Sequence, residues 1–111
     1  MLVFSALNTE TWKHMRLNEQ EKMAIREAIL GEDPTADIYL FGSRLDDSRR
    51  GGDIDLYVET AIQEKLLKHK TRMLSKLWAR IGVQRIDIIL KPRSAPLKAI
   101  HRAAKKTGIQ L

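Results

Sequence analysis

The sequence predicts an α/β (α+β) fold in which helices pack on a small mixed β-sheet. Short runs rich in β-branched and aromatic residues occupy positions 37–41, 53–59 and 85–90, as is typical of strands. Longer segments around them carry apolar residues at helical spacing. A chain of 111 residues has room for one hydrophobic core. We therefore expect a single domain over residues 18–111, preceded by an arm or short helix over 1–17.

The first helix of the domain is expected over Glu19–Leu30. Asn18 is typical of an N-cap, and Glu21, three positions later, completes a capping-box pattern. Gly31 ends the apolar stripe of this helix. Residues 1–17 show no comparable period.

Two further helices are expected. The first covers residues 61–80 and ends at Gly82 in a left-handed conformation. The second is capped by Ser94 and runs to Gly108. The residues expected on its inner face are Leu97, Ile100, Ala103 and Ala104. The last three residues of the chain are expected to add a short strand or to pack on the domain.

The charge of the chain is positive and unevenly distributed. Its formal net charge is +6 and its pI is near 9.8, which favours an anionic partner. Bases without any acid occupy residues 65–80 and 91–111. Each stretch is also consistent with a solvated helix face.

Several classes of protein are disfavoured by what the sequence contains. No apolar run approaches the roughly 18 to 20 residues that cross a bilayer, and the N-terminus lacks a signal-peptide pattern. The chain has no cysteine, which excludes disulfides and thiolate metal sites. We therefore expect a cytoplasmic protein.

Acidic residues interrupt two of the expected strands. Asp53 and Asp55 alternate with apolar residues, so their side chains point to one face of the strand and the apolar ones to the other. Asp87 interrupts the strand 85–90 in the same way. Aspartate is depleted in strands and costly to desolvate unless it is paired or bound to a cation. These three carboxylates therefore need a common explanation.

Two interpretations of the carboxylates are open. They could lie on a solvated face, which is common in antiparallel sheets covered on one side. Alternatively, the strands 53–59 and 85–90 lie side by side, and the three carboxylates converge on one or two divalent cations. Such hard oxygen ligands suit Mg²⁺ or Mn²⁺.

The residues directly after the strand 37–41 form a candidate phosphate-binding site. Gly42 would let the backbone approach a phosphate closely, and Ser43 offers both an amide and a hydroxyl. Arg44 could neutralise the same phosphate. A plain turn is the simpler interpretation of this tripeptide when it is taken alone.

Together these motifs resemble those of the nucleotidyltransferase superfamily that includes DNA polymerase β, and within it the minimal nucleotidyltransferases (MNT). The matching segments are "FGSR" at 41–44, "DIDLYV" at 53–58 and "RIDIIL" at 85–90. The resemblance implies a nucleotidyltransferase-fold domain in which Gly42 and Ser43 hold a triphosphate. It further implies that Asp53, Asp55 and Asp87 bind Mg²⁺, with Asp87 also a candidate for the base that activates the acceptor.

The function implied by this resemblance is transfer of a nucleoside monophosphate from an NTP, with ATP as the expected donor, to an acceptor hydroxyl. The family further implies a helical partner of the HEPN type, and hence an antitoxin role in a toxin–antitoxin pair. A non-catalytic antitoxin that only binds its partner is the alternative. A basic nucleic-acid-binding module is less favoured, because no stacking or helix-turn-helix motif accompanies the charge. The oligomeric state is left open.

Overall fold

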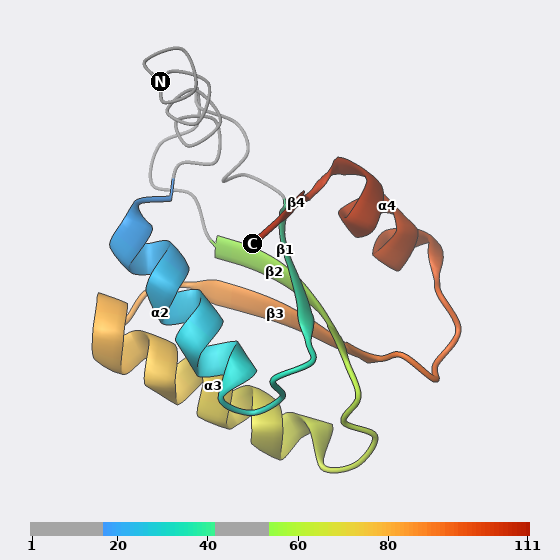
Figure 1. Ribbon diagram of the computed structural model, residues 1–111, viewed down its shortest axis with the longest axis horizontal. Coiled ribbons are helices and arrows are strands. Elements are labelled where there is room, and N and C mark those ends of the chain that lie inside the picture. The colour runs from blue at the N-terminus through green and yellow to red at the C-terminus, as the bar shows by residue number, and fades with distance from the viewer. Residues whose placement is uncertain (1–16, 42–53) are drawn as a thin grey trace.

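The computed structural model describes residues 17–41 and 54–111 (Figure 1). Its elements, in chain order, are α2 (Glu19–Leu30), β1 (Asp37–Phe41), β2 (Ile54–Thr60), α3 (Leu66–Ile81), β3 (Ile86–Pro92), α4 (Ala99–Thr107) and β4 (Ile109–Gln110). The described strands form one sheet in the order β3-β2-β1-β4. Strand β1 is antiparallel to β2 and β4, whereas β2 and β3 are parallel and connected through α3. This small mixed α/β domain confirms the predicted fold class.

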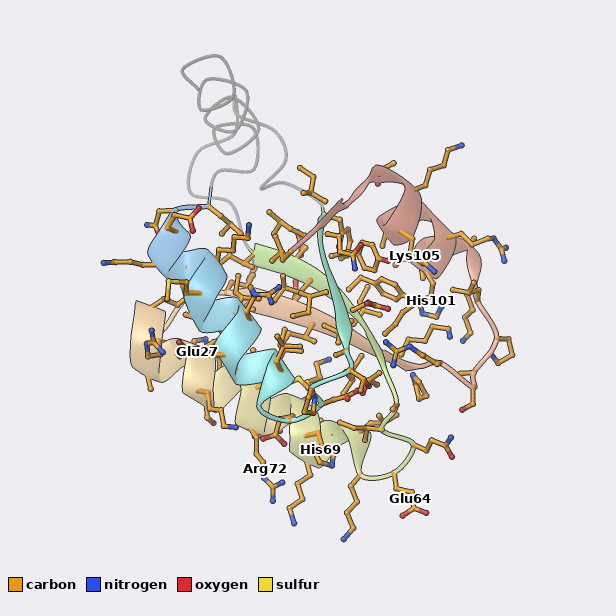
Figure 2. The ribbon with its side chains drawn as sticks, in the orientation of Figure 1. Glu27, Glu64, His69, Arg72, His101 and Lys105 are labelled. Atoms are coloured by element: carbon orange, nitrogen blue, oxygen red, sulfur yellow. The ribbon has the colours of Figure 1, made fainter. Side chains whose placement is uncertain are left out.

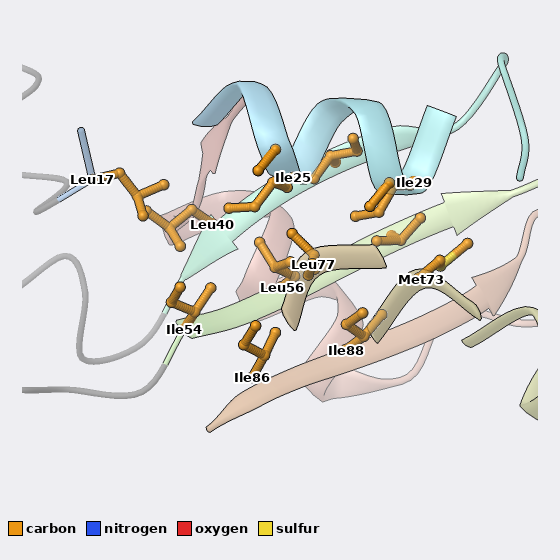
Figure 3. Close-up of a cluster of buried hydrophobic side chains, with 14 residues drawn as sticks. Leu17, Ile25, Ile29, Leu40, Ile54, Leu56, Met73, Leu77, Ile86 and Ile88 are labelled. Atoms are coloured by element: carbon orange, nitrogen blue, oxygen red, sulfur yellow. The ribbon is translucent and has the colours of Figure 1, made fainter. Parts of the chain in front are cut away.

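The hydrophobic core lies between one face of the sheet and the helices α2 and α3 (Figures 1 and 3). Strand residues on this face alternate with residues on the opposite face, as the sequence predicts for β2 and β3. Leu17 is also buried in this core, although the sequence places it in the arm. The strand side chains of the core are Ile38, Leu40, Ile54, Leu56, Val58, Ile86 and Ile88.

The start of α2 confirms the expected capping box. The Glu21 amide donates to Asn18 Oδ1 at 2.7 Å, and the Asn18 amide donates to Glu21 Oε1 at 3.1 Å. These two bonds satisfy amides that have no partner within the helix. Helix α2 ends before Gly31, as predicted.

The expected start of α3 is wrong by five residues, because residues 61–65 are not helical. The Ala61 amide donates to Asp33 Oδ2 at 2.8 Å, and the Ile62 amide donates to Thr60 Oγ1 at 3.0 Å. Lys65 then adopts a left-handed conformation with φ 54° and starts the helix. Gly82 has the positive φ expected of it, 90°, but its ψ of 160° is extended rather than left-handed helical.

The expected start and inner face of α4 are also wrong. Residues 93–95 form a turn instead of a helix start, in which the Ala95 amide donates to the Pro92 carbonyl at 3.0 Å. Of the expected inner face, Ala104 alone is buried, whereas Leu97 and Ile100 are 40% and 55% exposed. Helix α4 covers the face of the sheet opposite the core, where its packing partners are polar and aromatic.

The chain end confirms the expectation of a short C-terminal strand. Residues Ile109–Gln110 pair with β1, and the Leu111 amide donates to the Ile38 carbonyl at 2.8 Å. Gly108 makes this turn possible: a Cβ there would lie 2.3 Å from the Ala104 carbonyl oxygen. Separately, none of the described helices has the length and apolar content needed to span a membrane.

Candidate functional site

Asp55 and Asp87 lie side by side on neighbouring strands. They are register partners in the parallel pairing of β2 with β3, so both side chains are on the same face of the sheet. The strands are about 4.8 Å apart at such a pairing, which places the two carboxylates within reach of one shared cation. The structure thus places the strands of these two aspartates side by side, as the second of the two interpretations of the carboxylates requires. Gly42, Ser43 and Arg44, together with the third predicted carboxylate, Asp53, lie outside the described residues.

The pair occupies the face of the sheet that does not carry the core. Ile54 and Leu56, the neighbours of Asp55 along β2, are fully buried on the other face. Asp55 is half-buried and Asp87 is exposed, so a ligand can approach them from solvent. Phe41, the last residue of β1, pairs with Asp55, and Ile54 is the first residue of β2.

The donor set suits a hard divalent cation. Two carboxylates on rigid neighbouring strands provide oxygen ligands, and a cation between them would offset their mutual repulsion. Within residues 17–41 and 54–111, no three acidic, histidine or cysteine side chains gather as one metal-binding group. The predicted set includes Asp53, which is outside that range.

Further along the same face, Tyr57 is the centre of a buried cluster that the motifs did not reveal. Its hydroxyl donates to Glu59 Oε2 at 2.8 Å, and Lys105 Nζ is 3.3 Å from the same oxygen. The His101 ring stacks on Tyr57 with 5.5 Å between centroids, and Tyr39 lies 5.9 Å away. Figure 2 shows His101 and Lys105 on α4 over this face of the sheet. The period of two in β2 puts Tyr57 on the same face as Asp55, whereas its partners on α4 depend on how that helix packs.

The pKa values in this cluster favour uncharged rings. Burial, followed by the hydrogen bond to Glu59, raises the pKa of Tyr57 above its ordinary value. Burial, followed by the nearby positive charges of Lys91 and Lys98, lowers the pKa of His101. A neutral imidazole and a neutral phenol are suited to stacking, so the cluster serves to hold α4 on the sheet.

Asp33, like Glu59, is a buried acid that was not among the residues singled out from the sequence. Its carboxylate accepts the Thr60 hydroxyl at 2.6 Å, the Ala61 amide at 2.8 Å and the Thr35 hydroxyl at 2.7 Å. Burial by itself would raise the pKa of Asp33, but the hydrogen bonds from these three residues outweigh it and lower the pKa to about 2. The signal was the Asp33-Pro34-Thr35 sequence, in which aspartate commonly accepts from a residue two positions later.

Most of the bases along one side of α3 contact acids in α2 and in the turn after it. We call Lys68, Arg72, Lys76 and Arg80, spaced at four-residue intervals, the α3 row. Glu32, whose side chain is only 8% exposed, lies 2.8 Å from Lys76 Nζ and 3.6 Å from Arg72 Nη1. Arg80 pairs with Glu27. His69 Nδ1 adds a 2.8 Å contact to Glu32. This side of α3 is therefore linked to α2 and to the turn after it.

Comparison with protein-family models and with curated proteins found no match to this chain.

Proposed function

We propose that this chain is a Mg²⁺-dependent nucleotidyltransferase that transfers a nucleoside monophosphate from an NTP, with ATP as the first candidate, to an acceptor hydroxyl. The observation that carries the proposal is the register pairing of Asp55 with Asp87 on the face opposite the core. Its second support is the sequence: Gly42-Ser43 precedes the first strand aspartate at the spacing that resembles the minimal nucleotidyltransferases. The nucleotidyltransferase form of the fold belongs to the same proposal.

The chemistry asked of the protein is mainly positioning. Asp55 and Asp87, with Asp53 from the adjoining segment, would hold the cation. Bound Mg²⁺ supplies neutralisation of charge on the phosphates and lowers the pKa of a coordinated hydroxyl. Strand positions suit ligands that must not move, because the hydrogen-bonded ladder restricts their backbone. As the more exposed of the two described carboxylates, Asp87 is the better placed to accept a proton from an incoming acceptor.

The partner and the acceptor are part of the same proposal. A helical protein of the HEPN type would present a tyrosine hydroxyl, and the chain would act as the antitoxin that modifies it. A binding module without catalysis is the second candidate, favoured by the exposed basic and apolar side chains of α4. The nucleic-acid-binding alternative loses support, because three of the four bases in the α3 row contact acids of the same chain.

The first experiment measures binding and does not need a known acceptor. Titration calorimetry with ATP, GTP, CTP and UTP in turn, with and without Mg²⁺, should reveal a triphosphate whose binding requires the metal. Asp55→Asn and Asp87→Asn should each weaken this metal-dependent binding by about tenfold or more, which corresponds to roughly 1.4 kcal/mol. Glu64→Gln is the matched control, because Glu64 is exposed and lies beyond the end of β2.

The second experiment measures transfer. Intact-mass analysis after incubation with the bound nucleotide, Mg²⁺ and a helical partner should show a gain of one nucleoside monophosphate, and Asp87→Asn should abolish it. Binding of no triphosphate, or binding that both aspartate variants leave unchanged, would contradict the proposed site. Metal-dependent binding without transfer to any acceptor would favour the non-catalytic candidate.

A further inference from the structure

We infer that helix α4 presents a docking surface for an acidic amphipathic helix of a partner protein. We call it the α4 surface. It consists of Leu97, Lys98, Ile100, Arg102 and Lys106. The inference concerns a different part of the molecule from the paired aspartates, and it does not depend on nucleotidyl transfer.

The bases of this surface form a row. Lys98, Arg102 and Lys106 follow one another at four-residue intervals, so they lie along one side of the helix with about 6 Å between successive positions. All three are exposed. Across residues 17–41 and 54–111, no acid lies within ion-pair distance of any of them, and the sequence has no acid from residue 91 to the end. The Arg102 guanidinium donates to the Leu97 carbonyl at 2.9 Å.

Among the described residues, one acid forms an ion pair with α4, and it lies on the inner side of the helix. Glu59 accepts the Tyr57 hydroxyl and pairs with Lys105 on the inner side of the helix. Its side chain is 11% exposed, so it is covered by the helix that it holds. The outward row therefore retains its full positive charge.

Two exposed apolar side chains lie on or next to the same helix. Ile100 in α4 is 55% exposed, and Leu97, two residues before α4 begins, is 40% exposed, although the sequence predicts both on an inner face. Single exposed apolar residues are ordinary on a protein surface, and here Ile100, two positions from Lys98 and Arg102, lies on the opposite flank of the helix from the row. Between the row and Ile100 lie the exposed small residues Ala99 and Ala103, which allow another backbone to approach closely.

These features favour a protein helix over the other anionic partners. A helix that lies over Ala99 and Ala103 can direct acids toward the row on one side and apolar residues toward Ile100 on the other. Acids at four-residue intervals have the same spacing of about 6 Å as the row. A nucleic acid would meet the basic side chains but would gain little from aliphatic ones. Its nucleobases stack on aromatic rings, and the ring that α4 carries, His101, is already stacked on Tyr57. An anionic membrane would require a longer apolar face, usually with aromatic anchors.

The test uses a defined probe: a labelled synthetic peptide, helical in isolation, with glutamates at three successive four-residue intervals and leucines beside them. Fluorescence anisotropy measures its affinity for the full chain. Ile100→Ser and the triple variant Lys98→Glu/Arg102→Glu/Lys106→Glu should each weaken binding, the triple variant by at least about tenfold.

The matched control reverses charge elsewhere. The triple variant Lys65→Glu/Lys68→Glu/Lys70→Glu changes the net charge by the same amount, at bases near the start of α3 that have no ion pair within the described chain. It should change peptide affinity less than about threefold. Circular dichroism of each variant confirms that the fold is retained. A peptide of identical composition with its glutamates scrambled around the helix should bind more weakly.

The outcomes separate the partner classes. Binding that requires both Ile100 and the row, and that spares the α3 control, supports the inference. Equal losses in the two triple variants would overturn it, because only net charge would then matter. Tighter binding to single-stranded RNA, duplex DNA or phosphatidylserine vesicles than to the peptide, unaffected by Ile100→Ser, would also overturn it and would assign the row to that anion.

Discussion

Helices α3 and α4 carry the same sequence pattern of bases at four-residue intervals, yet the two rows have different surroundings. In α3, three of the four bases contact Glu27 or Glu32 from the α2 region. In α4, within the described part of the chain, the bases of the row meet no acid. The role of a basic helix face therefore depends on the element packed beside it. One row joins two helices, and the other is left for an outside partner.

The two helices also differ in how they are held. Helix α3 buries Met73 and Leu77 completely between α2 and the sheet (Figure 3). Helix α4 buries Ala104 and relies on the Tyr57–Glu59–Lys105 contacts. Apolar burial scales with the area removed from water, so α3 contributes more to stability than α4 does. Substitutions should reveal this ranking.

The largest expected effect is that of Leu77→Ala. Removing a fully buried leucine should lower the free energy of unfolding by about 2–5 kcal/mol, since transfer free energy is lost and a cavity remains. The comparison is Ala104→Gly in α4, which should cost about 1 kcal/mol through backbone entropy and lost contact. Urea denaturation measures both. Equal losses would contradict the ranking of the two helices.

The next effect is that of Glu32→Gln. Lys76, His69 and Arg72 all contact this nearly buried carboxylate, and Lys76 contributes most to lowering its pKa. Neutralising it should cost about 1–3 kcal/mol, because three cationic or polar groups lose a charged acceptor. The same measurement on Glu64→Gln, at an exposed acid outside either row, should show a change within about 0.5 kcal/mol. A comparable loss in both variants would mean that Glu32 does not bind the α3 row.

A pH titration tests Asp33, which closes the turn after α2. Hydrogen bonds hold its pKa at about 2, below the ordinary value of 3.8. The unfolded chain therefore binds a proton first as the pH falls. The stability that Asp33 provides is present above pH 3.8 and is lost as the pH falls through about 2.

The variant Asp33→Asn should be less stable than the parent chain at pH 7 by about 1–2 kcal/mol, since amides and hydroxyls lose a charged acceptor. Thermal unfolding followed by circular dichroism should show that this difference narrows between pH 4 and pH 2. A difference that stays constant over that interval would show that Asp33 does not stabilise the fold through its charge.

The smallest expected effect is that of Lys98→Gln/Arg102→Gln/Lys106→Gln. Because no described acid pairs with these bases, their removal should change the free energy of unfolding by less than about 0.5 kcal/mol. The contrasting variant Arg72→Gln/Lys76→Gln/Arg80→Gln removes three bases that do pair, and it should be clearly less stable. If the α4 variant were the less stable of the two, the α4 row would have a structural partner and the comparison would fail.

Local signals were enough to predict much of the fold. Helix α2 begins and ends where its capping box and Gly31 indicate, because those residues act within one helical turn. The strand faces follow from alternation, which places Ile54 and Leu56 in the core and Asp55 opposite them. The mixed sheet follows from a long helical connection between β2 and β3.

Other boundaries depended on residues far away in the chain. The predicted start of α3 was wrong because the Ala61 amide donates a hydrogen bond to Asp33, 28 residues earlier in the chain. The predicted inner face of α4 was wrong because this helix packs on the polar side of the sheet, against Tyr57 and Glu59. Its apolar Ile100 is therefore left exposed. Both errors arose because a contact with a distant part of the chain, which helical periodicity does not show, sets the helix start or the buried face.

The candidate site divides in the same way. The pairing of Asp55 with Asp87 was predictable, because both aspartates interrupt strands that a right-handed crossover would place side by side. Asp53 and the Gly42–Ser43–Arg44 segment remain predictions from the motif, since they lie outside the described residues.

Local sequence is enough to set where α2 is capped, which side of β2 is acidic, and which helices carry rows of bases. Which of those bases contact an acid depends on how the elements pack. Lys76 meets Glu32 across 44 positions in the chain, and Arg80 meets Glu27 across 53. The physical reason is that charge compensation acts over a few ångströms in space. Only the packing of α3 on α2, and of α4 on the sheet, shows which bases have an acid within that distance.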